Sequence, residues 1–329
     1  ALARNDGSLV GADVVIRDRI ENTMRLVSRN IAGALADGWS AGAAISDDGG
    51  TIVFSSTATD LVPGLDANGL RSDIYLFRAD TSLIQRISLN VVGLQPSTGS
   101  SMAPSVSAEG RYVAFTSTAE LVSPSRAPRT ADPESPGRSV SHVYVRDTQL
   151  HQTTRVAPKD RVPNGSSMSA VISRDGRFVA FVSQATNLVA DDRNRSTDVF
   201  LFDRSTGSIA LVSRNMAGRP ANGASGNPSV SSDSRLVAFQ SDASDLTCAD
   251  GCRSLAEDIN LVTDVFLFDR STSTVTQISG GAGGWMEESV APAVDATGQV
   301  VAFTSRHPID AWDVDDDFDL FLQVSSAPR

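Results

Sequence analysis

Residues 172–181 read ISRDGRFVAF, a short strand-forming segment followed by a turn and a second strand-forming segment. Asp-Gly is typical of a tight turn between antiparallel strands, because glycine tolerates positive φ and aspartate bonds the nearby backbone. The same pattern recurs at residues 45–54, 106–115, 230–239 and 294–303. Each segment ends in a phenylalanine, and successive phenylalanines lie 58 to 66 positions apart. The pattern therefore predicts an array of repeats, each beginning with two antiparallel strands.

Two more strands are predicted in each repeat. The third strand is rich in β-branched and aromatic residues, and it occupies residues 73–77, 142–146, 198–202, 264–268 and 319–323. A turn such as 203–207 and a fourth strand such as 209–213 follow it. Four antiparallel strands joined by turn residues make one blade of a β-propeller. We therefore predict an all-β fold, a β-propeller of four-stranded antiparallel blades.

The two ends of the sequence bear on the number of blades. Residues 13–18 and 24–28 match third and fourth strands, whereas the last repeat ends just after its third strand. Either the N-terminal strand closes the last blade of a five-bladed ring, or six blades exist and the first two strands of the first lie upstream of Ala1. We favour six. We expect a single propeller domain over residues 1–329, consisting of a partial blade at 1–36 and blades at about 39–90, 99–158, 166–215, 223–280 and 287–324.

The repeat resembles a known family. Ser-x-Asp-Gly-Arg-x-Val-Ala-Phe, followed by NLV at 187–189 and TDVFLFD at 197–203, resembles the TolB-like class of WD-like propeller repeats. The resemblance recurs five times and covers essentially the whole chain. It implies a periplasmic or extracellular bacterial protein, often with six blades, that commonly acts through protein contacts. A shared fold does not by itself specify a function.

Charge and hydropathy exclude two classes of function. The net charge is −11 and the pI is near 4.7, so phosphate backbones repel this surface and a nucleic-acid partner is not expected. The longest apolar runs have about five residues, far below the roughly 18 needed to cross a membrane. No membrane-spanning segment is therefore expected.

Acidic and amide residues precede several third strands at a shared spacing. Asp192-x-Asn194-x-x-x-Asp198 is matched by Asp258-x-Asn260-x-x-x-Asp264, and Asp66-x-Asn68 followed by Asp73 differs by one residue. Ca²⁺ binds six to eight oxygens, of which such a loop can supply several, but the full EF-hand pattern is absent. Two interpretations stay open: these nine residues bind calcium, or they cap their own backbone.

The cysteines are Cys248 and Cys252, separated by Ala-Asp-Gly. A metal site of soft ligands normally needs a second pair, which the sequence lacks. The Asp-Gly suits a tight turn, so we interpret the pair as a small loop disulfide, which would imply an oxidising compartment. Two free thiols are the alternative.

No motif of catalysis stands out. The three histidines, His142, His151 and His307, do not form a metal-binding pair, and no Gly-x-Ser-x-Gly nucleophile motif occurs. We therefore predict that the chain is not an enzyme but an exported protein-binding, scaffold or accessory subunit of a larger complex. A calcium-stabilised surface protein, or a hydrolase or lyase with a site in the channel, are the alternatives.

The connections between second and third strands are the expected binding loops. Those at 116–141 and 240–263 vary in length and composition on a uniform scaffold, as binding loops do, although a solvated insertion without function explains them equally. Three tryptophans, Trp39, Trp285 and Trp312, either pack at blade junctions or form a binding hot spot.

Overall fold

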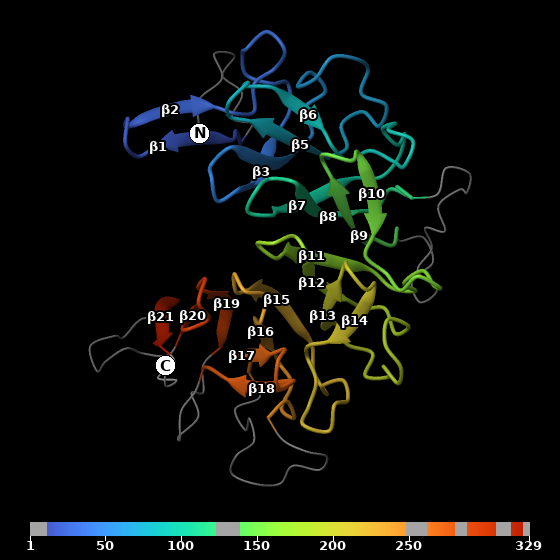
Figure 1. Ribbon diagram of the computed structural model, residues 1–329, viewed down its shortest axis with the longest axis vertical. Coiled ribbons are helices and arrows are strands. Elements are labelled where there is room, and N and C mark those ends of the chain that lie inside the picture. The colour runs from blue at the N-terminus through green and yellow to red at the C-terminus, as the bar shows by residue number, and fades with distance from the viewer. Residues whose placement is uncertain (1–11, 123–138, 248–261, 280–287, 307–316, 325–329) are drawn as a thin grey trace. The chain divides into compact units, whose positions relative to one another are not determined.

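The computed structural model describes residues 12–122, 139–247, 262–279, 288–306 and 317–324. Every regular element in these residues is a β-strand (Figure 1). No helix within the described ranges is long and apolar enough to cross a membrane. The chain divides into two compact units, Ala1–Val156 and Ala157–Arg329.

In its described residues the first unit contains three antiparallel sheets, and neighbouring strands follow the chain order in each. The strands are β1 (Val15–Asp18) and β2 (Thr23–Leu26); β3 (Ser40–Ile45), β4 (Thr51–Ser56), β5 (Asp73–Arg78) and β6 (Ile84–Arg86); and β7 (Ser101–Val106), β8 (Tyr112–Ser117), β9 (His142–Asp147) and β10 (Gln152–Arg155).

The described residues of the second unit form three sheets of the same kind. Their strands are β11 (Ser167–Ile172), β12 (Phe178–Ser183), β13 (Asp198–Asp203) and β14 (Ser208–Leu211); β15 (Ser225–Val230), β16 (Leu236–Ser241), β17 (Asp264–Asp269) and β18 (Thr274–Gln277); and β19 (Ser289–Val294), β20 (Val300–Ser305) and β21 (Asp319–Val324).

The predicted all-β propeller fold is confirmed. Each of the five sequence repeats forms the first two strands of a sheet, so β4, β8, β12, β16 and β20 are second strands as expected. The six blade-like sheets include the short N-terminal pair β1–β2, which runs antiparallel from Val15↔Leu26 to Asp18↔Thr23. The single domain over residues 1–329, with its blade limits, stays a prediction.

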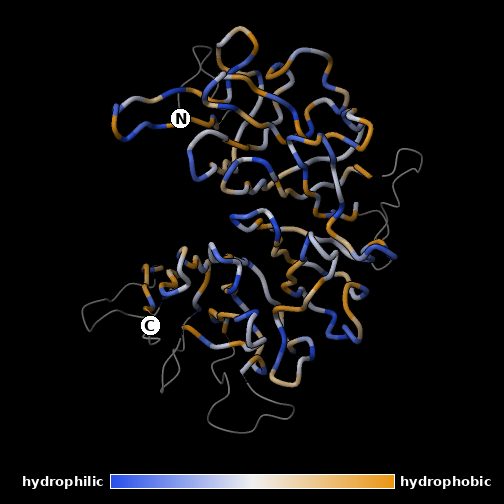
Figure 2. The backbone as a smooth tube through the Cα atoms, in the orientation of Figure 1, coloured by the Kyte–Doolittle hydropathy of each residue, from blue (hydrophilic) through white to orange (hydrophobic). Residues whose placement is uncertain are grey.

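The core of each four-stranded sheet contains an aromatic pair. The phenylalanine of the second strand lies opposite an aromatic residue of the third strand, and the ring centroids are 5.6–6.1 Å apart in Phe54–Tyr75, Phe115–Tyr144, Phe181–Phe200 and Phe239–Phe266. All eight rings are buried, as expected for the repeated phenylalanine. Figure 2 shows that hydrophobic residues occur in these strands and also at several loop tips.

Antiparallel order brings four strand ends together at one edge of each sheet. In β3–β6 this edge, which we call the loop edge, carries Ser40, Ser56, Asp73 and Ser88. The opposite edge, which we call the turn edge, carries the short turns within each strand pair. At the turn edge the arginine of the repeated motif binds the aspartate that ends the third strand, as Arg177 does with Asp203 at 2.7 Å.

A pair of buried serines closes the loop edge of each of the five repeats. The first residue of the first strand and the last residue of the second strand are serines whose Oγ atoms are 2.8–3.0 Å apart, in Ser40–Ser56, Ser101–Ser117, Ser167–Ser183, Ser225–Ser241 and Ser289–Ser305. All ten are buried. Because a buried hydroxyl without a partner is costly, these pairs favour one register of the two strands.

Substitution of Phe239 by alanine tests the aromatic core. Phe239 is fully buried in a cluster that includes Val237 and Phe266. Phe239→Ala should lower the free energy of unfolding by about 3–5 kcal/mol, because it removes buried apolar surface and leaves a cavity. Urea denaturation measures the change. Leu150→Ala, at an exposed turn-edge position, is the control and should stay within about 0.5 kcal/mol of the parent; a loss below about 1 kcal/mol for Phe239→Ala would contradict this account of the core.

Candidate functional site at the loop edge

The aspartate that begins the third strand is held by a serine at the end of the fourth. Ser88 Oγ donates to Asp73 Oδ1 at 2.6 Å and accepts from the backbone N–H of Ile74 at 3.1 Å. The same bonds occur in Asp13–Ser28, Asp198–Ser213 and Asp264–Ser279, where the serine-to-aspartate distances are 3.1, 2.7 and 2.6 Å. We call this arrangement the Asp–Ser clasp. It joins the start of the third strand to the end of the fourth, so these aspartates do have a structural role.

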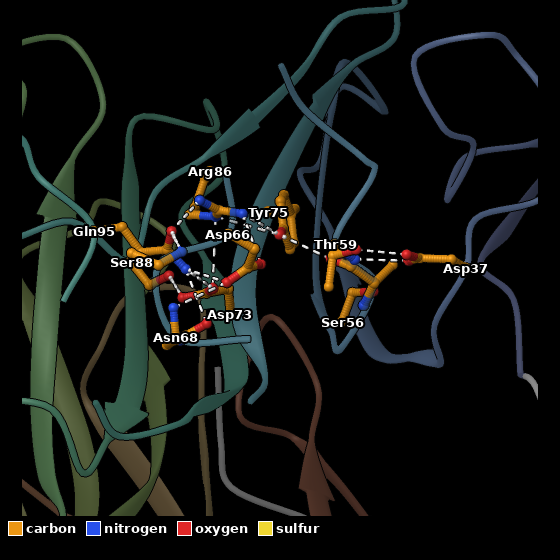
Figure 3. A network of polar contacts seen from close by, with 12 residues as sticks. Asp37, Ser56, Thr59, Asp66, Asn68, Asp73, Tyr75, Arg86, Ser88 and Gln95 are labelled. Atoms are coloured by element: carbon orange, nitrogen blue, oxygen red, sulfur yellow. Dashed lines mark hydrogen bonds and ion pairs between the residues drawn. The ribbon is translucent and has the colours of Figure 1, made fainter. Parts of the chain in front are cut away.

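The structure brings Asp66, Asn68 and Asp73 together, as the sequence predicted (Figure 3). The backbone N–H of Asn68 donates to Asp66 Oδ1 at 3.2 Å, and the side chain of Gln95 links all three residues. Gln95 Nε2 lies 2.8 Å from Asp66 Oδ1, 2.9 Å from Asn68 Oδ1 and 2.7 Å from Asp73 Oδ2. A neutral amide group with two N–H donors therefore lies within hydrogen-bond distance of three oxygens from three different positions.

Arg86 balances the charge of this cluster. Its guanidinium lies 2.9 Å from Asp66 Oδ2 and 3.5 Å from Asp73 Oδ2, and it also donates to the hydroxyl of Tyr75. Burial raises the pKa of Asp73 above its usual value, although Ser88 and Arg86 oppose the shift. Burial likewise raises the pKa of Tyr75 to about 12. The acidic groups of this cluster are thus neutralised within the protein, by the Arg86 guanidinium and the Gln95 amide.

The second cluster, in β11–β14, contains the predicted residues, but its hydrogen-bond network is not completed by an arginine and a glutamine as it is in β3–β6. Asn194 Nδ2 donates to Asp198 Oδ2 at 2.8 Å and to the carbonyl of Ala221 at 2.9 Å. Asp192 is 7% exposed, and its Oδ1 atom is buried without a hydrogen-bond partner. Burial raises the pKa of Asp198 to about 6, and the nearby charge of Asp192 adds to the shift.

The sheet β7–β10 has different residues at the position of the Asp–Ser clasp. His142 replaces the aspartate of the clasp, and Ala157 stands where the serine is found in the other sheets. His142 is buried and its Nδ1 atom has no partner among the described residues. Beside it, Arg155 forms an ion pair with Glu120 and lies over the ring of Tyr144. Burial lowers the pKa of His142 to about 4, and the positive charge of Arg155 contributes.

Several predicted residues lie outside the described part of the chain. These are Asp258, Asn260, Cys248, Cys252, Trp285, Trp312 and His307, together with 123–138 of the first expected binding loop and 248–261 of the second. Asp264 is described and buried in its clasp. Trp39 is partly exposed at the loop edge, next to Ser40. The disulfide and the third acidic cluster stay predictions.

Calcium binding also stays a prediction. Among the described residues, no group of three or more His, Cys, Asp or Glu side chains is arranged to hold a metal ion. Each of the two described clusters offers two carboxylates and one carboxamide. The oxygen ligands of calcium include carboxylates, amide carbonyls, backbone carbonyls and water.

Sequence reasoning missed the groups that complete the site. Arg86 and Gln95 lie 20 and 29 positions from Asp66, beyond the local spacing on which the prediction relied. A signal for the clasp was present, because a serine follows the third-strand aspartate by 15 positions in Asp13, Asp73, Asp198 and Asp264.

Comparison with known proteins gives structural neighbours only. No protein-family model matches the sequence, and no curated protein matches it. The chain is similar to TolB from Acinetobacter baumannii (16% identity, covering 95% of this chain and 60% of that one, TM-score 0.45). It is also similar to an oligogalacturonate lyase in complex with manganese (10% identity, covering 95% and 75%, TM-score 0.53) and to dipeptidyl peptidase 4 from Porphyromonas gingivalis (14% identity, covering 94% and 40%, TM-score 0.51).

These similarities concern the fold alone. The chain resembles TolB and other β-propeller domains at low sequence identity, and it spans less than two thirds of that TolB and of the peptidase. The neighbours include enzymes as well as TolB. The shared fold therefore does not specify an activity.

His142 should make stability depend on pH. Its pKa in the folded protein is about 4 against 6.5 for the ordinary side chain, so the unfolded chain takes up a proton first as the pH falls. The contribution of neutral His142 is present above pH 6.5 and is lost between about pH 6.5 and 4. From pH 7 to pH 5 the parent should lose about 2 kcal/mol more stability than a His142→Gln variant.

Urea denaturation of both proteins at the two pH values measures this difference. The comparison with His142→Gln cancels the titration of the other groups. Equal losses of stability in the two proteins would show that the imidazole is not kept neutral by its surroundings.

Proposed function

We propose that this chain is a non-catalytic, exported β-propeller that binds another protein through its loop edge, as a scaffold or accessory subunit. One observation carries the proposal. Turns of a single design lie at the loop edge in three of the connections between consecutive sheets, and each presents an apolar side chain to solvent.

The design of these turns is rigid. In each, an asparagine Oδ1 accepts two backbone N–H groups, two and four residues further along the chain, at distances of 2.9–3.1 Å. The asparagines are Asn30, Asn90 and Asn215. A turn fixed by its own side chain loses little conformational entropy when it docks against a partner.

The residues at the tips of these turns are apolar and exposed. Ile31 is 69% exposed, Val91 is 42% exposed and Met216 is 72% exposed, and each directly follows the capping asparagine. Leu65 and Leu70, in the loop between β4 and β5, are also exposed. Single exposed apolar residues are common, but their recurrence at one position of a rigid turn is typical of a contact surface.

The turns are also tied to the neighbouring binding loops. The N–H of Ile31 donates to the carbonyl of Asp60, and the N–H of Val91 donates to the carbonyl of Leu121. Each turn thus packs against the second-to-third strand connection of the following sheet. Such connections on a rigid scaffold commonly carry binding residues.

Export to the periplasm or the outside of the cell belongs to the same proposal. The resemblance of the repeats to the TolB-like class supports it. The larger complex expected from the sequence would then form around the loop edge, and the acidic net charge of −11 favours a partner with a basic surface.

Charged substitutions at the turn tips test the proposal. The parent, immobilised as a full chain, captures partners from an extract of its native cells, and a captured protein is then purified and its affinity measured. Ile31→Asp and Met216→Asp should each weaken that affinity at least tenfold, because a charge replaces an apolar anchor. Both sites are exposed, so the free energy of unfolding should change by no more than about 0.5 kcal/mol.

Leu150→Asp is the matched control. Leu150 is 59% exposed but lies in the turn between β9 and β10, at the turn edge. It should leave the affinity unchanged. If the loop-edge variants bind every captured protein as tightly as the parent, or if Leu150→Asp weakens binding equally, the loop edge is not the contact surface.

A further inference from the structure

The two described acidic clusters occupy the same place in their sheets but differ in what neutralises them. In β3–β6, Arg86 supplies a positive charge and Gln95 Nε2 lies 2.7–2.9 Å from three oxygens. These oxygens surround the amide nitrogen at distances not far above those of oxygen ligands around a calcium ion. The Gln95 amide nitrogen therefore occupies the position in which this cluster could bind a cation.

Both internal donors are missing from the equivalent positions of β11–β14. Strand register gives the first correspondence, because Tyr75 pairs with Arg86 and Phe200 pairs with Leu211. The turns give the second, because Gln95 and Pro220 each lie five residues after the capping asparagine. Leucine and proline can donate no side-chain hydrogen bond. This sheet therefore has the two acids but no counterpart of Arg86 or Gln95 at these positions.

The result is an unsatisfied buried carboxylate. Asp192 is 7% exposed, its Oδ1 atom has no hydrogen-bond partner, and its carboxylate accepts the backbone N–H of Asn194. Asp198 is fully buried beside it, bonded to Ser213 and Asn194. Neither carboxylate has an arginine or lysine partner in the part of the chain that the structure describes. Buried charges of this kind are normally paired or coordinate a metal.

We propose that Asp192 and Asp198, with the carbonyl of Ala221 nearby, form a calcium site in the second unit. The equivalent cluster of the first unit, at Asp66 and Asp73, binds no ion because Arg86 and Gln95 already satisfy it. Hard oxygen donors with two negative charges favour Ca²⁺ over softer metals, and water can complete its coordination.

Calorimetric titration of the full chain with CaCl₂ tests the assignment. Asp192→Asn keeps the size of the side chain and removes its charge, so the number of calcium ions bound per chain should fall by one relative to the parent. Asp66→Asn, the same change in the closed cluster, should leave the number unchanged. The comparison is between variants because Asp258, Asn260 and Asp264 share the spacing and can contribute ions of their own.

Thermal melting separates loss of the ion from loss of the fold. In calcium-free buffer Asp192→Asn should melt at the same temperature as the parent or higher, because an unpaired buried charge has been removed. Added CaCl₂ should raise the melting temperature of the parent more than that of Asp192→Asn, since a ligand bound to the native state alone stabilises it. MgCl₂ at the same concentration should raise it less.

A double variant supplies the donors that this sheet lacks. Leu211→Arg with Pro220→Gln restores the pair found in β3–β6 and should remove the same bound ion while both carboxylates stay in place. The proposal is overturned if Asp192→Asn binds as many calcium ions as the parent, if Asp66→Asn also loses one, or if Mg²⁺ stabilises the parent as strongly as Ca²⁺ does.

Discussion

A buried carboxylate at the start of the third strand constrains the loop edge of these sheets. Asp73, Asp198 and Asp264 are at most 2% exposed, and a charge in such a place is unfavourable unless hydrogen bonds or an opposite charge compensate it. The serine that follows 15 positions later supplies the first bond and receives one from the backbone. This clasp fixes the end of the fourth strand against the start of the third. The turns that leave the fourth strand, with their exposed apolar tips, are positioned by it.

The sheets differ in how they satisfy the remaining charge. In β3–β6 an arginine and a glutamine close the network. In β7–β10 the carboxylate is absent, and the exchange of aspartate for His142 coincides with the exchange of serine for Ala157. In β11–β14 Asp198 is bonded to Ser213 and Asn194, but Asp192 Oδ1 has no hydrogen-bond partner and neither acid pairs with an arginine of the described residues. The repeats share one backbone design, but their loop edges have diverged into chemically different sites, which is expected where binding loops are built on a common scaffold.

The sequence was sufficient for the strands and their order, because the Asp-Gly turns and the Val-Ala-Phe segments recur with the same flanking pattern. It also singled out acids that the fold places together in two clusters. It did not reveal Arg86 or Gln95, because only the folded sheet brings residues so far along the chain next to Asp66. Nor did it reveal that the first strand of each repeat has a residue with positive φ that is usually not glycine: Ala103, Ser169, Asn227 and Ala291 occupy the position that Gly42 has in β3. There the sheet overrides the local preference of the residue.

In our proposal the acids of β11–β14 need an external ion, whereas those of β3–β6 do not. The most direct measurement is a crystal structure of the protein grown with CaCl₂, with an anomalous difference map. We expect a calcium peak about 2.3–2.6 Å from an oxygen of Asp192, and Gln95 Nε2 still between Asp66 and Asp73. A map with no peak at Asp192, or with calcium in place of the Gln95 amide, would contradict it.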